Sequence, residues 1–283
     1  MTMALLKYAG SKGALAESLI DLMVPDVHAG AYYEPFCGTA AVALELIRRG
    51  RLARTATVSL NDANRFVVGL LRHVRGATET VVRHLQGLIE TYNSAESDPQ
   101  RAEIYTGWVS QMNAAVEVNP RVAALVVTVN RTCFNGLMRL NASGKFNVPF
   151  ANKSRIATEL VDSVRETGDL LRELPVGLTQ VEFDAEQDDP HAGDIVYYDP
   201  PYFGTFSQYT ARKFQSDDLE RLAEVARRQA RRGVAVYVSN SDCPEVRAAF
   251  VGSKFHELQV PRRISCKVSE RGTTSELFIV VRG

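Results

Sequence analysis

A short apolar run that two prolines cut off is the strongest constraint on the fold of this chain. Ile195–Tyr198 has the length, and the β-branched and aromatic content, of a strand that is buried on both faces. Asp199 follows, and then Pro200 and Pro201, which can continue neither a central strand nor a helix. The chain must therefore turn out of its sheet here, with a carboxylate at the end of the strand.

The turn Asp199–Tyr202 presents groups that suit a planar ring bearing an amino group. The Asp199 carboxylate and the Pro200 carbonyl are hydrogen-bond acceptors only, whereas an exocyclic –NH2 group offers two donors. Tyr202 adds an aromatic face on which such a ring can stack. An ordinary turn can use the same residues, so the functional interpretation depends on the rest of the chain.

Strands and helices alternate on both sides of a central segment. Before that segment, the sequence predicts strands over 31–33 and 55–60, a turn over 34–38, and helices over 39–49 and from about residue 63. After it, strands are expected over 176–183, 195–198, 234–239, 255–260 and 277–281, helices over 217–232 and from residue 244, and a polar loop over 261–276. This order is typical of an α/β domain with a largely parallel sheet.

The central segment has a different pattern. Residues 72–120 are predicted to be helical with a polar break at 93–99, and a further helix is predicted over 121–132. Asn135-Gly136 and Asn141–Gly144 are then hairpin and turn signals. The expected organisation is an α/β domain of residues 1–72 and 156–283, with a helical and hairpin subdomain inserted at 73–155.

Charge is balanced overall but unevenly distributed. Lys plus Arg and Asp plus Glu both number 33, so net charge does not indicate a polyanionic partner. Residues 121–158, however, contain no Asp or Glu. The bases in this stretch are Arg121, Arg131, Arg139, Lys145, Lys153 and Arg155. It is either a phosphate-facing surface or simply a solvated basic face.

Cysteine usage and hydropathy narrow the class of protein further. The four cysteines lie far apart, and no Cys-x-x-Cys pair or Cys/His cluster occurs, so no metal site is expected. The N-terminus lacks a basic-then-apolar signal segment, and no apolar run is long enough to span a membrane. These features predict a reduced, cytoplasmic setting.

Three acidic residues end predicted strands: Glu34, Asp62 and Asp199. Ligands of open parallel sheets bind at the carboxyl edge, where an acid after the second strand can accept both ribose hydroxyls of a nucleoside. The Gly38 turn has no second glycine to approach a pyrophosphate, so a nucleoside with a positively charged sulfonium tail fits better than NAD. Helix capping and turn formation are the alternative roles of Glu34 and Asp62.

Taken together, these segments resemble Dam-type (alpha group, D12 class) DNA adenine-N6 methyltransferases over most of the chain. The matching motifs, in family order, are Lys7–Lys12, Glu34–Gly38, Asn61-Asp62 with Asn64, Arg131–Arg139, Phe146–Phe150, Asp199–Tyr202 and Ser239–Asp242. In one departure, Ala40 stands where the family usually has a second glycine.

The resemblance implies a Rossmann-like sheet that uses S-adenosyl-L-methionine, with an inserted DNA-recognition subdomain. It implies methyl transfer to N6 of an adenine flipped out of duplex DNA, with GATC as one candidate recognition sequence. Its catalytic residues would be Asp199, Pro200 and Tyr202. Its cofactor-binding residues would be Tyr8, Lys12, Glu34, Phe36, Gly38, Asp62, Phe183 and Asp199. The enzyme would act as a monomer, without a metal, in a bacterial or phage-infected cell.

DNA contacts are expected from the inserted subdomain and from a late loop. The implied set is Lys7, Arg131, Phe134, Asn135, Leu137, Arg139, Pro149, Arg262, Arg263 and Lys267. Arg139 would read a guanine in the major groove, and Phe134-Asn135 would enter the space that the flipped adenine leaves. Arg262, Arg263 and Lys267 would hold phosphates, although a solvated charged loop is the alternative.

Two other functions use a similar Asp/Asn-Pro-Pro-Tyr site or the same fold. One is methylation of RNA adenine or of a protein glutamine, which the inserted hairpin disfavours. The other is DNA binding without catalysis, which the intact Asp199–Tyr202 motif and Lys12 disfavour. The sequence leaves open whether the protein serves a restriction–modification system, serves a phage, or acts alone.

Overall fold

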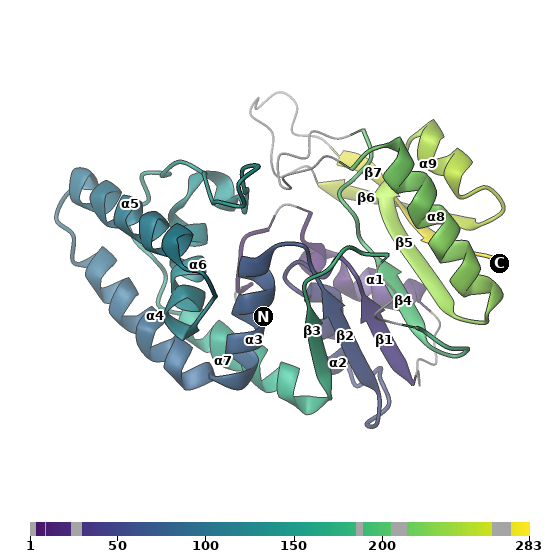
Figure 1. Ribbon diagram of the computed structural model, residues 1–283, viewed down its shortest axis with the longest axis horizontal. Coiled ribbons are helices and arrows are strands. Elements are labelled where there is room, and N and C mark those ends of the chain that lie inside the picture. Colours follow the sequence, from purple (N-terminus) through teal and green to yellow (C-terminus); the bar gives the residue numbers. More distant parts are fainter. Residues whose placement is uncertain (1–3, 9, 24–29, 185–188, 205–213, 262–272) are drawn as a thin grey trace. The chain divides into compact units, whose positions relative to one another are not determined.

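The computed structural model describes residues 4–8, 10–23, 30–184, 189–204, 214–261 and 273–283. The chain divides into two compact units, which Figure 1 shows in sequence colours. The sheet unit spans residues 14–62, 174–208 and 212–283, and the helical unit spans residues 1–13, 63–173 and 209–211.

The sheet unit contains a seven-stranded sheet of order β3-β2-β1-β4-β5-β7-β6. Its strands are β1 (Ala31–Glu34), β2 (Thr57–Asn61), β3 (Val176–Thr179), β4 (Ile195–Tyr198), β5 (Ala235–Ser241), β6 (Lys254–Pro261) and β7 (Thr273–Val280). The first five in spatial order pair in parallel, whereas β7 runs antiparallel to both β5 and β6. The predicted α/β class is therefore confirmed, and the carboxyl ends of β1, β2 and β4 share one edge.

Helices of the sheet unit bury apolar stripes. They are α1 (Ala16–Leu22), α2 (Ala41–Arg48), α8 (Ser216–Arg231) and α9 (Pro244–Ala249). α8 begins at a capping box formed by Gln215 and Asp218. Its buried residues Leu219, Leu222 and Ala226 recur at helical spacing and pack with β4, β5 and β7 into one core.

Several element boundaries differ from the predictions. β6 and β7 extend into the predicted polar loop over 261–276, since Pro261 pairs with Thr273 and Leu258 pairs with Glu276. Backbone hydrogen bonds hold such a hairpin, so its ends need no apolar side chains to continue the ladder. β3 ends at Thr179 rather than at residue 183, and α1 was not predicted.

Among the residues that the structure describes, five longer helices form the helical unit. They are α3 (Arg65–Gly76), α4 (Thr78–Asn93), α5 (Asp98–Ala114), α6 (Pro120–Thr132) and α7 (Leu160–Glu173). α6 is buried along nearly its whole length, and α3, α4 and α5 pack against it. The side chains of Asn64, Ser97 and Asn119 cap α3, α5 and α6, which explains where these helices begin. The predicted insertion, residues 73–155, lies within this unit.

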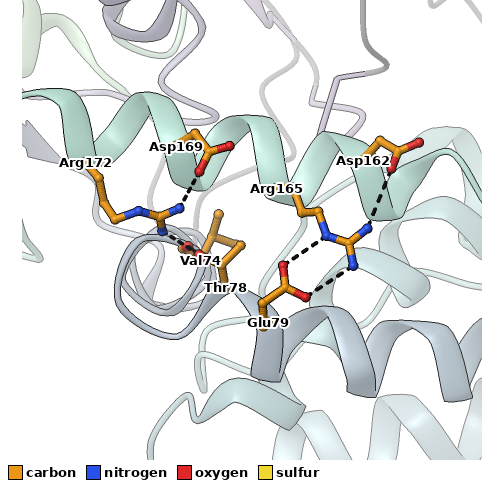
Figure 2. A network of polar contacts seen from close by, with 7 residues as sticks. All are labelled: Val74, Thr78, Glu79, Asp162, Arg165, Asp169 and Arg172. Carbon is orange, nitrogen blue, oxygen red and sulfur yellow. Dashed lines mark hydrogen bonds and ion pairs between the residues drawn. The ribbon is translucent and has the colours of Figure 1, made fainter.

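Polar contacts and close packing join α7 to the junction of α3 and α4 (Figure 2). Arg165 donates hydrogen bonds to both carboxylate oxygens of Glu79, at 2.9 and 3.2 Å. Arg172 donates to Thr78 Oγ1 at 2.5 Å, and Thr78 Oγ1 donates to the carbonyl of Val74 at 2.6 Å. Exposed ion pairs contribute at most about 1 kcal/mol each, so packing should matter more at this junction.

Gly168 of α7 is expected to be required for that packing. A Cβ on Gly168 would lie 2.7 Å from both the Val74 carbonyl oxygen and Thr78 Oγ1. Gly168→Ala should therefore lower the free energy of unfolding by about 1–3 kcal/mol, measured by urea denaturation. Gly87→Ala in α4 is the control, because no described atom beyond its chain neighbours and the adjoining backbone of its own helix lies within 4 Å of the new Cβ, and alanine favours a helix. Equal stability of the two variants would contradict the packing argument.

None of the helices in the described ranges has both the length and the hydropathy needed to cross a membrane. Over the same ranges, His, Cys, Asp and Glu side chains form no group of three or more that could hold a metal ion.

Candidate active site

Three acidic residues gather at the carboxyl edge of the sheet, as their positions after predicted strands suggested. Glu34 ends β1, Asp62 follows β2 and Asp199 follows β4, and these strands are neighbours in the sheet. Asp199 and Asp62 both raise the pKa of Glu34 by charge repulsion, which shows that the carboxylates lie close enough to interact. The sheet thus brings three carboxyl groups to one place.

Glu34 is the most buried of the three, with 3% of its surface exposed. Its Oε2 accepts hydrogen bonds from Tyr32 Oη at 3.0 Å and from the backbone N–H of Ala43, in the first turn of α2, at 3.2 Å. Burial, reinforced by the neighbouring carboxylates, raises its pKa from 4.5 to about 8, despite the opposing effect of these bonds. Glu34 is therefore mainly protonated at neutral pH, and it anchors the start of α2.

Asp62 is tied to the turn that follows β1. Its Oδ2 accepts a hydrogen bond from the backbone N–H of Gly38 at 2.9 Å. The neighbouring Asn61 holds the same turn, because its Nδ2 donates to the Pro35 carbonyl and its carbonyl accepts from the Cys37 N–H. Asp62 thus has a role in turn formation, beside any role toward a ligand.

Ala40, the departure from the family motif, takes a conformation that glycine would adopt more easily. Its φ of 55° is left-handed, which costs a residue with a side chain about 1–2 kcal/mol. α2 consequently begins at Ala41, two residues later than predicted.

Aromatic rings stand beside the acidic edge. The rings of Phe36 and Phe183 are 5.2 Å apart between centroids, and Phe214 lies 6.4 Å from each. The Arg221 guanidinium lies 5.0 Å from the centroid of the Phe183 ring and pairs with Asp184 at 3.0 Å. The fold thus brings together Phe36 and Phe183, two predicted cofactor residues far apart in sequence.

The turn Asp199–Tyr202 is held by the neighbouring strands β5 and β7. Tyr202 Oη donates to Glu276 Oε2 at 2.7 Å. Asn240 Oδ1 accepts from the Phe203 N–H at 3.1 Å, and Ser241 Oγ donates to the Phe203 carbonyl at 2.7 Å. Asn240 is fully buried, and its Nδ2 donates to no described residue. Sequence reasoning missed Glu276, because it was assigned to a polar loop, and gave Asn240 no role.

In the helical unit, Asn130 joins the N-terminal segment to the Phe134–Gly136 loop. Its Oδ1 accepts from the Lys7 N–H at 2.7 Å, and its Nδ2 donates to the carbonyls of Lys7 and Gly136 at 2.8 and 2.9 Å. Gly136 has a φ of 66°, and a Cβ there would lie 2.4 Å from that of Lys7. Sequence reasoning missed Asn130, because the burial that marks this amide is set by tertiary packing and not by a local pattern.

Positive charge accumulates around Lys7. Lys153 and Arg131 lower its pKa, after the larger effect of burial. Burial also lowers the pKa of Arg131 to about 10, and its guanidinium donates to the Ala4 carbonyl. Phe134, three residues after Arg131 in the sequence, exposes 45% of its surface, which is unusual for so large an apolar side chain.

The segment after Phe134 folds back as a hairpin with only two isolated pairings, Cys133 with Phe150 and Leu140 with Phe146. Arg139 and Pro149 lie on its opposite arms, so the structure gathers seven predicted DNA-binding residues in the helical unit: Lys7, Arg131, Phe134, Asn135, Leu137, Arg139 and Pro149. Tyr8 and Lys12 also belong to this unit, Lys12 being buried. Arg262, Arg263 and Lys267 lie outside the described residues.

The chain is similar to known proteins over nearly its whole length. The family model for D12 class N6 adenine-specific DNA methyltransferases matches residues 8–264. The Type II methyltransferase M1.LlaDCHI of Lactococcus lactis subsp. cremoris is 25% identical, over 98% of this chain and 94% of that protein. The Retron Ec67 DNA adenine methylase of Escherichia coli is 28% identical, over 98% of this chain and 90% of that protein. The DNA adenine methylase of Escherichia coli strain K12 is 26% identical, over 99% of this chain and 95% of that protein. From the extent of the family match, this chain belongs to the D12 class of N6 adenine-specific DNA methyltransferases.

Proposed function

We propose that Asp199, Pro200 and Tyr202 hold an adenine flipped from duplex DNA, next to S-adenosyl-L-methionine bound at the edge formed by Asp62, Phe36 and Phe183. The observation that carries the proposal is the convergence of acidic strand ends and aromatic rings beside the Asp199–Tyr202 turn. GATC is one candidate for the recognition sequence.

The residues at this edge fit such a cofactor. Asp62 offers carboxylate oxygens to ribose hydroxyls, Phe36 and Phe183 offer apolar faces to an adenine ring, and Asp199 carries negative charge toward a sulfonium. The buried Nδ2 of Asn240 adds a hydrogen-bond donor near the end of the turn. When bound, S-adenosyl-L-methionine supplies a methyl group that is already activated by its positively charged sulfur.

The protein's contribution to the chemistry is electrostatic and positional. Adenine N6 is a poor nucleophile, because its lone pair is delocalised into the ring. The Asp199 carboxylate and the Pro200 carbonyl can accept both N6 hydrogens, which favours the tetrahedral amine that forms during attack. Tyr202 would stack on the adenine, and its bond to Glu276 fixes the orientation of its ring.

The helical unit would supply the DNA contacts. Its exposed Phe134 suits insertion into the space that the flipped adenine leaves, and Lys7, Arg131 and Lys153 form a cationic cluster suited to DNA. Arg139 would read a guanine through a bidentate contact. Arg262, Arg263 and Lys267 would add phosphate contacts from the late loop.

Methylation assays with labelled cofactor test this function. Duplex DNA, RNA and a glutamine-containing peptide are offered side by side, and only duplex DNA should acquire label, on adenine N6. Label in RNA or peptide alone would contradict the proposal, as would DNA binding without transfer to any substrate. Mapping N6-methyladenine in a host that expresses the chain then identifies the recognition sequence.

Substitution of Asp62 separates its ligand role from its role in the turn. Asp62→Ala should weaken binding of S-adenosylhomocysteine by about 1.5–3 kcal/mol, measured by calorimetry, and should change DNA affinity less. Asp62→Asn keeps an acceptor for the Gly38 N–H and loses only the charge. Asp62→Asn should therefore also bind the cofactor product more weakly. Wild-type affinity in both variants would leave Asp62 as a turn residue only.

A further inference from the structure

The Arg139 guanidinium forms hydrogen bonds across its hairpin to Asn147. Arg139 Nε donates to Asn147 Oδ1 at 2.8 Å, and Arg139 Nη2 donates to the Asn147 carbonyl at 2.9 Å. The Asn147 N–H in turn donates to the Arg139 carbonyl at 3.4 Å. Two hydrogen bonds from the arginine side chain to one residue fix both the position and the plane of the guanidinium.

The arm that carries Asn147 is itself anchored to the helical unit. Phe146 is buried, and its N–H and carbonyl bond to the side chain of Asn113 at 2.8 and 2.9 Å. On the other side of Asn147, the Val148 carbonyl accepts from Tyr105 Oη at 2.6 Å. Asn147 therefore has a fixed backbone but an exposed side chain, so its amide contributes little to the core.

The chemistry of this pair suits base recognition. The two bonds use the Nε–Nη2 edge of the guanidinium, whereas an end-on contact with guanine O6 and N7 uses Nη1 and Nη2, so both can coexist. A carboxylate in place of Asn147 would also orient Arg139, but it would neutralise its charge and repel the DNA phosphates. The neutral amide orients the arginine without either effect, and it lies in the stretch 121–158 that contains no acid.

We propose that Asn147 is a positioning residue for sequence recognition, which pre-orients Arg139 and thereby sets discrimination at one base pair of the target. The inference rests on the proposed function, in which Arg139 reads a base. Pre-orientation spares the cost of ordering a flexible arginine when DNA binds. Loss of the Asn147 side chain should therefore reduce the preference for the correct base at that position by about three- to tenfold.

The test measures kcat/KM on the preferred duplex and on duplexes with single base-pair substitutions, at two salt concentrations. The variants are Asn147→Ala, Arg139→Ala and the double variant, with Lys145→Ala as a control on the same hairpin. Asn147→Ala should lower discrimination at the same base pair as Arg139→Ala, leave the other positions and the salt dependence unchanged, and add nothing in the Arg139→Ala background. Lys145→Ala should affect all duplexes alike.

Asn147→Asp provides a rescue, because its carboxylate can still accept from Arg139 Nε. It should keep the discrimination at that base pair while slowing methylation of every duplex, since it adds negative charge. The inference is overturned if Arg139→Ala relaxes one position but Asn147→Ala does not, or if Asn147→Ala slows all duplexes equally whether or not Arg139 is present. If Arg139→Ala itself leaves every base preference intact, the assignment of Arg139 as a base-reading residue is wrong. The proposed role of Asn147 is then wrong as well, because it acts through Arg139.

Discussion

Replacing Asp199 by alanine is expected to lower the rate of methyl transfer by about two to three orders of magnitude, without unfolding the protein. Asp199 follows the buried strand β4 but is itself partly exposed, so its removal opens no cavity in the core. In the proposed mechanism, the variant loses a hydrogen bond from adenine N6 to Asp199, which strengthens as positive charge develops on nitrogen. The measurement is single-turnover transfer of labelled methyl groups, with circular dichroism to confirm the fold.

Asp189→Ala is the matched control for this experiment. Asp189 is also an acid of the sheet unit, but it pairs with Arg232 on the surface at 2.6 Å. Its loss should change neither the rate nor the stability by much, because exposed ion pairs contribute little. If folded Asp199→Ala enzyme works within about threefold of the wild type, the catalytic assignment of the Asp199–Tyr202 turn is wrong.

Replacing Glu34 by glutamine is expected to remove a pH dependence of stability. Burial, with repulsion from Asp199 and Asp62, raises the pKa of Glu34 from 4.5 to about 8 in the folded protein. Between these values the folded state binds a proton that the unfolded state releases, so stability falls as pH rises. The slope is about 1.4 kcal/mol per pH unit at most, and it ends near pH 8, where the folded protein also ionises Glu34.

Urea denaturation from pH 5 to pH 8.5 measures this effect. The glutamine carbonyl can still accept from Tyr32 Oη and the Ala43 N–H, so Glu34→Gln should match the wild type near pH 5 and exceed it in stability near pH 8. Glu224→Gln, on the exposed face of α8, is the control and should follow the wild type at every pH. Parallel curves for wild type and Glu34→Gln would show that Glu34 ionises normally in the folded state.

The sequence by itself determined the fold class and the position of the Asp199–Tyr202 turn. The length and composition of Ile195–Tyr198 predicted a buried strand, which is confirmed, and two prolines fixed where it ended. Helices such as α6 were also predicted closely, because apolar periodicity and a capping residue are local signals. Elements held by backbone pairing between distant segments were placed less well, as the early start of β7 shows.

The tertiary structure alone decided which residues support the site. Glu276 reaches Tyr202 across 74 residues of chain, and Asn130 reaches Lys7 across 123. No local pattern distinguishes these side chains from a polar loop residue or a helix residue, because their role depends on a partner that only folding brings near. Asn147 stands inside a recognised motif, yet only the hairpin geometry shows that its amide faces Arg139. The type and order of the strands and helices follow from short-range constraints in the sequence, whereas the orientation of a functional side chain is set by long-range contacts.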